Sequence, residues 1–594
     1  MGVSELTEHL KTAFEYKNNG DYKQSIDYFY KALAIDNEST EIMSELASLY
    51  SKLCRYERSI SFYEQILQKD NENNDAKYKL AYLLKITKDY KRAEEILTEL
   101  YNAGFNIEET AVELFFIMVY NHKYGRIITS FNKYSKRLKN SSALYFVALA
   151  HSELGNKNTA DEFFRKSFNN DEKNILPGIE IANRLLEKGK KEEAKQFANR
   201  LLKYTEDDRI YYLLAEIEYS DGNLENAIKY YSYAIKINPK KAKYYFRLAL
   251  TFSLKGFFKE AEESYCKAIN LDSGNETYNY ALAYMYYITA KYELAEKITD
   301  YLLYRNPDNM QAVSLKILIL TENNKNQFAG KLIEKLEQEI NKDDFAYYSQ
   351  AIYYSKLNLW EKASEAIREA LKLNKDSLEY NYQSAKFNYE LGKADEAKHI
   401  CEKILKENPK YIQAYILLSK ICYAQKDYIK AQSLINKVME LDKNIAEAYS
   451  LNAAIYIEQK NYEKAIEQYK IAASISPDNE EYYAKIAECY YKSEQYKDAY
   501  AYYKEAADFN ITMAKYRYYM AKCSELTNDN ENALSNYSFA KRLAPSNTEY
   551  LKDYAQFLYK IGKKRDAVNL LKSIKKQMST EAAEDIKSLI KKYK

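Results

Sequence analysis

Glycine, proline, histidine and tryptophan are scarce in this chain of 594 residues. It contains 13 Gly, 6 Pro, 4 His and 1 Trp, while charged residues make up 29% of it. So few helix-breaking residues are typical of a mostly helical chain. The net charge of +3 is close to balance, so we expect no general attraction to nucleic acid.

Long apolar runs are also absent. Every apolar run, including the largely apolar residues 315–320, is well short of the roughly 18 apolar residues that a membrane span needs. The N-terminal segment carries Glu5, Glu8 and Lys11 and has no hydrophobic centre, so a secretory signal is not expected. The 6 cysteines form no paired framework, which favours a reducing compartment. Together these features predict a soluble, cytoplasmic protein without a membrane span.

The residue patterns that carry catalysis or metal binding are missing as well. The sequence has no His-Glu-x-x-His helix, no Cys-x-x-Cys pair and no glycine-rich phosphate loop. Cys489 and Cys523 are 34 residues apart and occupy the same position in adjacent segments of similar pattern, which favours packing over metal ligation. We therefore predict no enzyme, no cofactor, no metal and no small-molecule substrate.

What the chain does contain is a regular internal repeat. Alanine recurs at a nearly constant step in two series, of which Ala215, Ala249 and Ala283 represent the first. Ala227 and Ala261 represent the second, which has the same step and a constant offset from the first. The step is about 34 residues, and a period of this order predicts a stacked array in which each unit buries its apolar face against its neighbours.

Residues 208–241 illustrate one unit. Tyr211 and Leu214 begin a pattern with helical spacing, Gly222 interrupts it as a turn would, and a second helical pattern follows. Pro239 ends the unit, because proline lacks the N–H that a helix needs to continue. The unit is therefore predicted to be a hairpin of two short helices, with the alanines allowing those helices to approach closely.

This pattern resembles the tetratricopeptide repeat, which has a small residue at position 8, Tyr at 11, Ala at 20, an aromatic residue at 24 and Pro at 32. Five of the six prolines fall at position 32: Pro239, Pro307, Pro409, Pro477 and Pro545. The resemblance covers nearly the whole chain. It implies an all-α fold, a right-handed α-solenoid superhelix of about 17 helix-turn-helix repeats, each of about 34 residues, with a C-terminal capping helix.

Two units depart from this rule. In the fourth, Phe115 and Ile127 occupy both small-residue positions, and in the tenth Ile317 replaces the first alanine. The predicted organisation is repeats 1–3 at 6–107, degenerate repeat 4 at 108–140, repeats 5–9 at 141–309, degenerate repeat 10 at 310–343, repeats 11–17 at 344–581 and a cap helix at 582–594. Harmless drift and a hinge are both open explanations for the two degenerate units.

The resemblance also implies a groove, because in this family positions 2, 5, 9, 12 and 13 of the first helices face a ligand. Position five holds Tyr78, Tyr145, Tyr212, Tyr280, Tyr348, Tyr382 and Tyr518, and position twelve holds Tyr219, Tyr287, Tyr389, Tyr423, Tyr491 and Tyr559. Tyrosine offers a rigid apolar face and a polar tip, which suits recognition of a peptide or helix. Packing between successive first helices is the alternative interpretation. A/T-rich codon usage is a further explanation for the 64 tyrosines.

Three further groove candidates come from the carboxylate clamp with which some members of this family hold the tails of heat-shock chaperones. Asn183, Lys243 and Arg247 match three of its five positions, whereas Ile179 and Leu213 occupy the other two. A terminal carboxylate would lose two contacts, so we expect no complete clamp.

The sequence thus favours a non-enzymatic scaffold or adaptor that binds partner proteins or peptides, of unknown identity, in a long groove. One alternative is an accessory arm of a separately encoded enzyme, such as a glycosyltransferase, or of a secretion or assembly complex. Another is association with a polyanion through the C-terminus, where residues 560–594 hold eleven Lys or Arg against four Asp or Glu.

Overall fold

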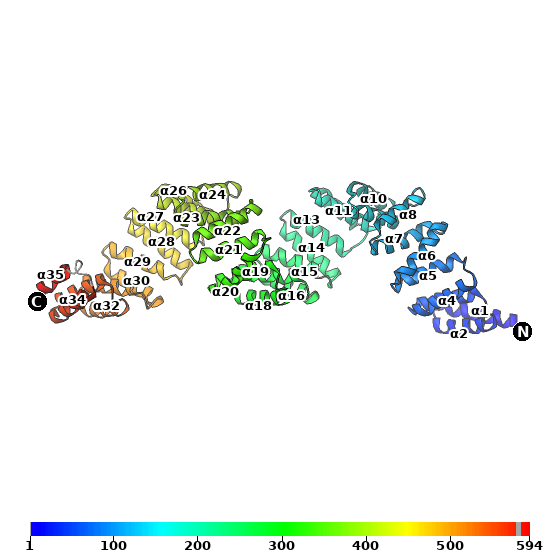
Figure 1. Ribbon diagram of the computed structural model, residues 1–594, viewed down its shortest axis with the longest axis horizontal. Helices are drawn as coiled ribbons and strands as arrows, with labels where there is room; N and C mark the ends of the chain where they lie inside the picture. Colours follow the sequence, from blue (N-terminus) through cyan, green and yellow to red (C-terminus); the bar gives the residue numbers. More distant parts are fainter. Residues whose placement is uncertain (1, 578–583, 594) are drawn as a thin grey trace. The chain divides into compact units, whose positions relative to one another are not determined.

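The computed structural model describes residues 2–577 and 584–593, and within them the chain forms 35 α-helices and no strand. Helices α1 to α34 pair as consecutive hairpins and α35 follows them (Figure 1). The predicted all-α repeat solenoid of 17 hairpins and a final helix is confirmed.

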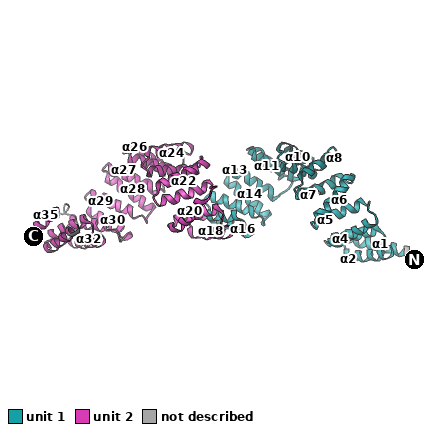
Figure 2. Cartoon of the chain, viewed as in Figure 1, with its two compact units in different colours: residues 1–285 teal, residues 286–594 magenta. Residues whose placement is uncertain are grey.

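The chain divides into two compact units, residues 1–285 and 286–594 (Figure 2). The first contains α1 (Gly2–Asn18), α2 (Tyr22–Ile35), α3 (Thr40–Lys52), α4 (Tyr56–Lys69), α5 (Asn74–Ile86), α6 (Tyr90–Ala103), α7 (Ile107–Tyr120), α8 (Tyr124–Tyr134), α9 (Ser141–Glu153), α10 (Lys157–Asn170), α11 (Ile175–Glu187), α12 (Lys191–Leu201), α13 (Asp208–Ser220), α14 (Leu224–Ile237), α15 (Ala242–Leu254) and α16 (Phe258–Leu271). The boundary falls within α17 (Glu276–Ile288). The three blocks expected from the sequence remain a proposal.

The second unit continues the same alternation of helices. It contains α18 (Tyr292–Arg305), α19 (Met310–Glu322), α20 (Asn326–Gln338), α21 (Asp344–Lys356), α22 (Trp360–Leu373), α23 (Leu378–Glu390), α24 (Ala394–Glu407), α25 (Ile412–Ala424), α26 (Tyr428–Leu441), α27 (Ala446–Glu458), α28 (Tyr462–Ile475), α29 (Glu480–Lys492), α30 (Tyr496–Phe509), α31 (Ala514–Leu526), α32 (Asn530–Leu543), α33 (Thr548–Lys560), α34 (Lys564–Gln577) and α35 (Glu584–Tyr593).

The hairpin of α13 and α14 shows why the alanines recur. Ala215 and Ala227 are both fully buried and share one cluster with Tyr231 of the same hairpin and Leu248 of the next. The small side chains let the two helices approach closely, and the large ones fill the space toward the following unit. Each hairpin therefore completes its core with its neighbour, as a stacked array requires.

Each hairpin turn contains one residue with a left-handed backbone. In seven turns it is glycine, for example Gly222 with φ 75°. In the other ten it is Cys54, Lys88, His122, Ala290, Asn324, Asn358, Lys426, Lys460, Glu494 or Asn528. The turn geometry is thus kept in all seventeen hairpins, although side chains other than glycine rarely adopt this conformation.

We expect Gly222→Ala to destabilise its hairpin and Ala290→Gly to stabilise its own, each by about 1 kcal/mol. A Cβ at residue 222 would meet no atom within 4 Å, so the effect arises from the backbone alone. Thermal unfolding of the two variants measures it, and shifts in the same direction would contradict the explanation.

The two units with a large side chain in place of the first small residue pack differently from the others. Phe115 and Ile127 are fully buried in the fourth hairpin, and α7 packs more extensively on α9 than on its own partner α8. In the tenth, Ile317 is fully buried and α19 packs more extensively on α21 than on α20. In both units, a large buried side chain at the eighth position thus accompanies extensive packing between successive first helices.

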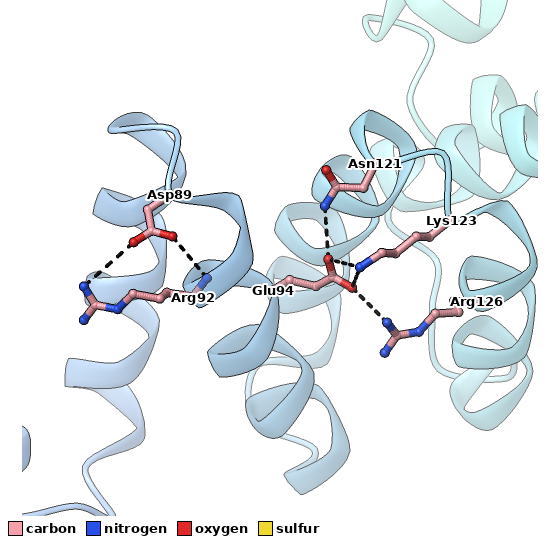
Figure 3. A network of polar contacts seen from close by, with 6 residues as sticks. All are labelled: Asp89, Arg92, Glu94, Asn121, Lys123 and Arg126. Atoms are coloured by element: carbon pink, nitrogen blue, oxygen red, sulfur yellow. Dashed lines mark hydrogen bonds and ion pairs between the residues drawn. The ribbon is translucent and has the colours of Figure 1, made fainter.

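Ion pairs connect the fourth hairpin to the third. The carboxylate of Glu94 on α6 accepts bonds from Asn121 at 3.1 Å, Lys123 at 2.8 Å and Arg126 at 3.0 Å (Figure 3). The side chain of Glu94 is only 7% exposed. A buried carboxylate thus joins α6 to both the turn and the second helix of a unit with an unusual core.

The final helix covers the last hairpin, as the predicted cap would. Ile586 and Tyr593 of α35 are buried against α34, and the Tyr593 ring stacks on Tyr559 with centroids 3.9 Å apart. Lys587 and Lys591 of the same helix are exposed. Residues 582, 583 and 594 of the predicted cap, and 578–581 of the last predicted repeat, lie outside the described residues.

Candidate functional site

First helices α23, α25 and α27 enclose a pocket of about 260 Å³. Its lining comes from residues 2, 5, 6, 9, 12 and 13 of successive units, which are largely the positions expected to face a groove. The main lining side chains are Tyr382, Lys386, Tyr389, Ile416, Lys420 and Glu447. This pocket therefore brings together two of the tyrosines expected in the groove.

The chemistry of this pocket is mixed. Tyr382 is half-buried beside Tyr411, with ring centroids 5.9 Å apart, and burial raises the pKa of Tyr382 to about 12. Its hydroxyl stays protonated at neutral pH and can donate a hydrogen bond. Lys420 on α25 forms an ion pair with Glu447 on α27. Ring faces, hydroxyls and charges of both signs can thus meet one ligand here.

In the first compact unit, α13 and α15 bring four expected groove residues together. The Lys243 ammonium lies 4.9 Å from the ring centre of Tyr212, and the Arg247 guanidinium lies 4.5 Å from that of Tyr219. Arg247 also donates to both oxygens of Glu216, at 2.7 and 2.6 Å. A ligand carboxylate would have to compete with Glu216 for the Arg247 guanidinium. Asn183 lies apart from this group, half-buried on α11.

Several tyrosines at position five stack against the following first helix. The ring of Tyr212 lies on Tyr244, that of Tyr348 on Tyr380 and that of Tyr518 on Tyr550, with centroids 5.0, 5.1 and 4.1 Å apart. Tyr518 is only 4% exposed. These rings help to join successive units, whatever contact their outer faces make with a ligand.

The remaining tyrosines expected in the groove are half-buried on first helices, and Tyr559 is stacked against the cap helix. They are Tyr78 on α5, Tyr145 on α9, Tyr280 and Tyr287 on α17, Tyr423 on α25 and Tyr491 on α29. Burial raises the pKa of Tyr145 to about 12. Its hydroxyl therefore stays protonated at neutral pH.

On α19 the side chains at three of the expected groove positions are buried. Ser314, Leu318 and Thr321 stand at positions 5, 9 and 12 of this unit, and all three are fully buried. Leu318 belongs to a core against which Tyr287 and Tyr348 pack. The tenth unit therefore offers no open surface there. The largely apolar segment 315–320 was the sequence signal for this burial, and even its Lys316 is buried.

A larger pocket lies outside the positions of the groove tyrosines. It has a volume of about 660 Å³ and lies among α1, α3 and α5, with Leu10, Phe14 and Glu41 in its lining. Its described lining contains no tyrosine, so the pattern of tyrosines at groove positions did not indicate this pocket. The sequence feature that could have indicated it is Phe14, an aromatic residue at the ninth position of the first repeat.

Reactive groups are few in the described part of the chain. No group of three or more His, Cys, Asp or Glu residues there is arranged to hold a metal ion. Burial raises the pKa of the Cys401, Cys489 and Cys523 thiols to about 12, so they stay protonated. Among the residues with described positions, no helix is both long and apolar enough to cross a membrane.

Several known sequence families match parts of this chain. The family described as the second ARM domain of tetratricopeptide repeat protein 21 matches residues 224–460. Models of the tetratricopeptide repeat itself match residues 13–39, 42–77, 141–174, 179–242 and 453–494. No curated protein matches the sequence.

Solved structures that the chain matches include the APC/C hetero-tetramer Cut9-Hcn1, at 14% identity, covering 89% of this chain and 98% of that one, with a TM-score of 0.42. YrrB, described as a TPR protein with an unusual peptide-binding site, is 19% identical over 32% of this chain and 97% of its own, with a TM-score of 0.29. For pilF of Pseudomonas aeruginosa the identity is 19%, the coverage 36% and 97%, and the TM-score 0.32.

The repeat matches lie in both compact units, and they agree with the alanine, tyrosine and proline positions and with the succession of helical hairpins. The chain is a member of the tetratricopeptide repeat family.

Proposed function

We propose that the chain is a non-enzymatic scaffold whose pocket among α23, α25 and α27 binds a segment of a partner protein. The observation that carries this proposal is the convergence of Tyr382, Tyr389, Lys386 and Lys420 on one hollow, from residues that the repeat places on the same side of successive first helices. Such pockets, with aromatic faces and a few polar groups, are typical of peptide recognition.

The affinity of this pocket for the partner segment is expected to depend on a few aromatic side chains. Tyrosine is enriched among residues whose truncation weakens protein interfaces most. Tyr382 and Tyr389 are half-buried and therefore already held by their own helix and its neighbours. A partner that covers their remaining surface would lose little side-chain entropy from these two residues on binding.

We expect the double variant Tyr382→Ser and Tyr389→Ser to bind its partner at least about tenfold more weakly, with unchanged helicity. Affinity purification of the wild-type chain and the variant in parallel, followed by titration of the proteins lost from the variant, measures this. The matched control is Tyr301→Ser with Tyr304→Ser on second helix α18, where the side chains are 41% and 87% exposed.

Equal retention of all partners by both double variants would refute this site. Loss of circular dichroism in the groove variant would instead assign the two tyrosines to the core. Co-purification of one stoichiometric catalytic protein would favour the accessory-arm alternative. Binding of heparin that is lost on deletion of residues 560–594 would favour association with a polyanion.

A further inference from the structure

The pocket among α1, α3 and α5 differs in chemistry from the one described above. Its volume is about 660 Å³, and its lining combines an apolar part with acidic side chains. The apolar part includes Leu6, Leu10 and Phe14 of α1 and Phe29 of α2. The acidic side chains are Asp36, Glu41, Glu45 and Asp75.

The apolar part presents an aromatic anchor point. Phe14 is 40% exposed although its ring packs edge-on against the buried Phe29, with centroids 5.2 Å apart. Leu6 and Leu10 are half-buried on the same helix. An apolar side chain that entered the pocket would cover these surfaces and gain the free energy of removing them from water.

The charged side chains that line the pocket are all negative. Four carboxylates line the pocket, and its lining, as far as the structure describes it, contains no lysine or arginine. Two cations outside the lining offset part of this charge, since Lys17 pairs with Glu45 and Lys79 pairs with Asp75 at 2.6 Å. Asp36 accepts the backbone N–H of Glu38 at 3.3 Å, a bond that leaves its negative charge in place. The pocket therefore keeps an excess of negative charge beside an apolar surface.

We propose that this pocket binds a partner-protein segment in which large apolar side chains are flanked by lysine or arginine. The proposal rests on the scaffold function, and it adds a second site that is selective for cationic segments. The apolar side chain of the segment would lie against Phe14, while its cations would lie near Glu41 and Asp36. Such complementarity selects partners by charge, and it makes association sensitive to salt.

A fluorescein-labelled peptide of leucine and lysine in amphipathic order tests this on the full-length chain. The double variant Asp36→Lys with Glu41→Lys should weaken its binding about tenfold or more, because two contacts change from attractive to repulsive. The control is Glu38→Lys with Glu57→Lys, which changes the net charge equally at exposed positions outside the lining. It should change the dissociation constant less than about twofold.

Phe14→Ala tests the apolar half of the site, with Phe328→Ala, a 60% exposed ring on α20, as its control. Of these two variants, only Phe14→Ala should weaken binding. A peptide with glutamate in place of lysine should bind neither the Phe14→Ala nor the Phe328→Ala variant. Equal weakening by both charge-reversal pairs would overturn the proposal, because the attraction would then not come from the pocket. Self-association of the chain that Asp36→Lys with Glu41→Lys abolishes would also overturn it, because a second copy would then be the occupant.

The two sites can fail separately. The Tyr382→Ser and Tyr389→Ser variant should bind the leucine–lysine peptide as the wild type does. If that variant loses the peptide while Asp36→Lys with Glu41→Lys keeps it, the acidic pocket is refuted and the scaffold function stands.

Discussion

Replacing Lys123 and Arg126 together by Met should destabilise the third and fourth hairpins by about 3–5 kcal/mol. Both cations bind the carboxylate of Glu94, whose side chain is 7% exposed (Figure 3). Without them the buried charge would keep only its bond from Asn121. Removing the partners of a buried charge is costly, because the charge loses its compensation but stays out of water.

Two controls separate this explanation from a general loss of surface charge. Adding Glu94→Gln to the double variant should recover part of the lost stability, because it removes the uncompensated charge. Arg92→Met breaks the pair with Glu64, in which both side chains are more than a third exposed. That change should cost less than about 1 kcal/mol.

Urea unfolding followed by circular dichroism measures the effect. The only tryptophan, Trp360, lies on α22 in the second compact unit. Its fluorescence transition should therefore stay in place while the helical signal begins to fall at lower urea. A double Met variant as stable as the wild type would show that Glu94 is solvated and that these ion pairs contribute little.

The hairpin succession was predictable because it depends on contacts between residues close in sequence. Alanines at positions 8 and 20 allow the two helices of one unit to approach, and proline at position 32 ends the second helix. The alanines recur in most units and the proline in five of them, so the register is visible even where a residue has changed. Glycine appears in only seven of the seventeen left-handed turns, and the register, not the turn residue, located the others.

The candidate site was less predictable, because a pocket depends on which side chains remain uncovered after packing. Position alone does not distinguish Tyr382, which lines a pocket, from Tyr518, which is buried under Tyr550. It also does not reveal that α19 is enclosed on its groove face. In that unit Ile317 stands in place of the first alanine, and α19 packs more extensively on α21 than on its partner α20.

Tyrosines at position 24 differ from those in the groove, and Tyr537 provides the clearest test. Tyr537 on α32 is 1% exposed and lies parallel to Tyr554 of the next hairpin, with centroids 5.3 Å apart. Its hydroxyl donates to Glu525 at 2.9 Å. We expect Tyr537→Ala to cost about 3–5 kcal/mol, because it leaves a cavity between two hairpins that each depend on this ring.

Tyr537→Phe should cost only about 1 kcal/mol, because the ring stays and only the hydrogen bond to Glu525 is lost. Tyr304→Ala, where the side chain is 87% exposed, should change stability by less than about 0.5 kcal/mol. Because hairpins in a stacked array depend on their neighbours, the Ala variant should unfold near α31–α34 before Trp360 on α22 responds. Coincident transitions by circular dichroism and tryptophan fluorescence at a lowered midpoint would instead show that the second compact unit unfolds as a whole. Tyr537 would then stabilise all of that unit and not only its last hairpins.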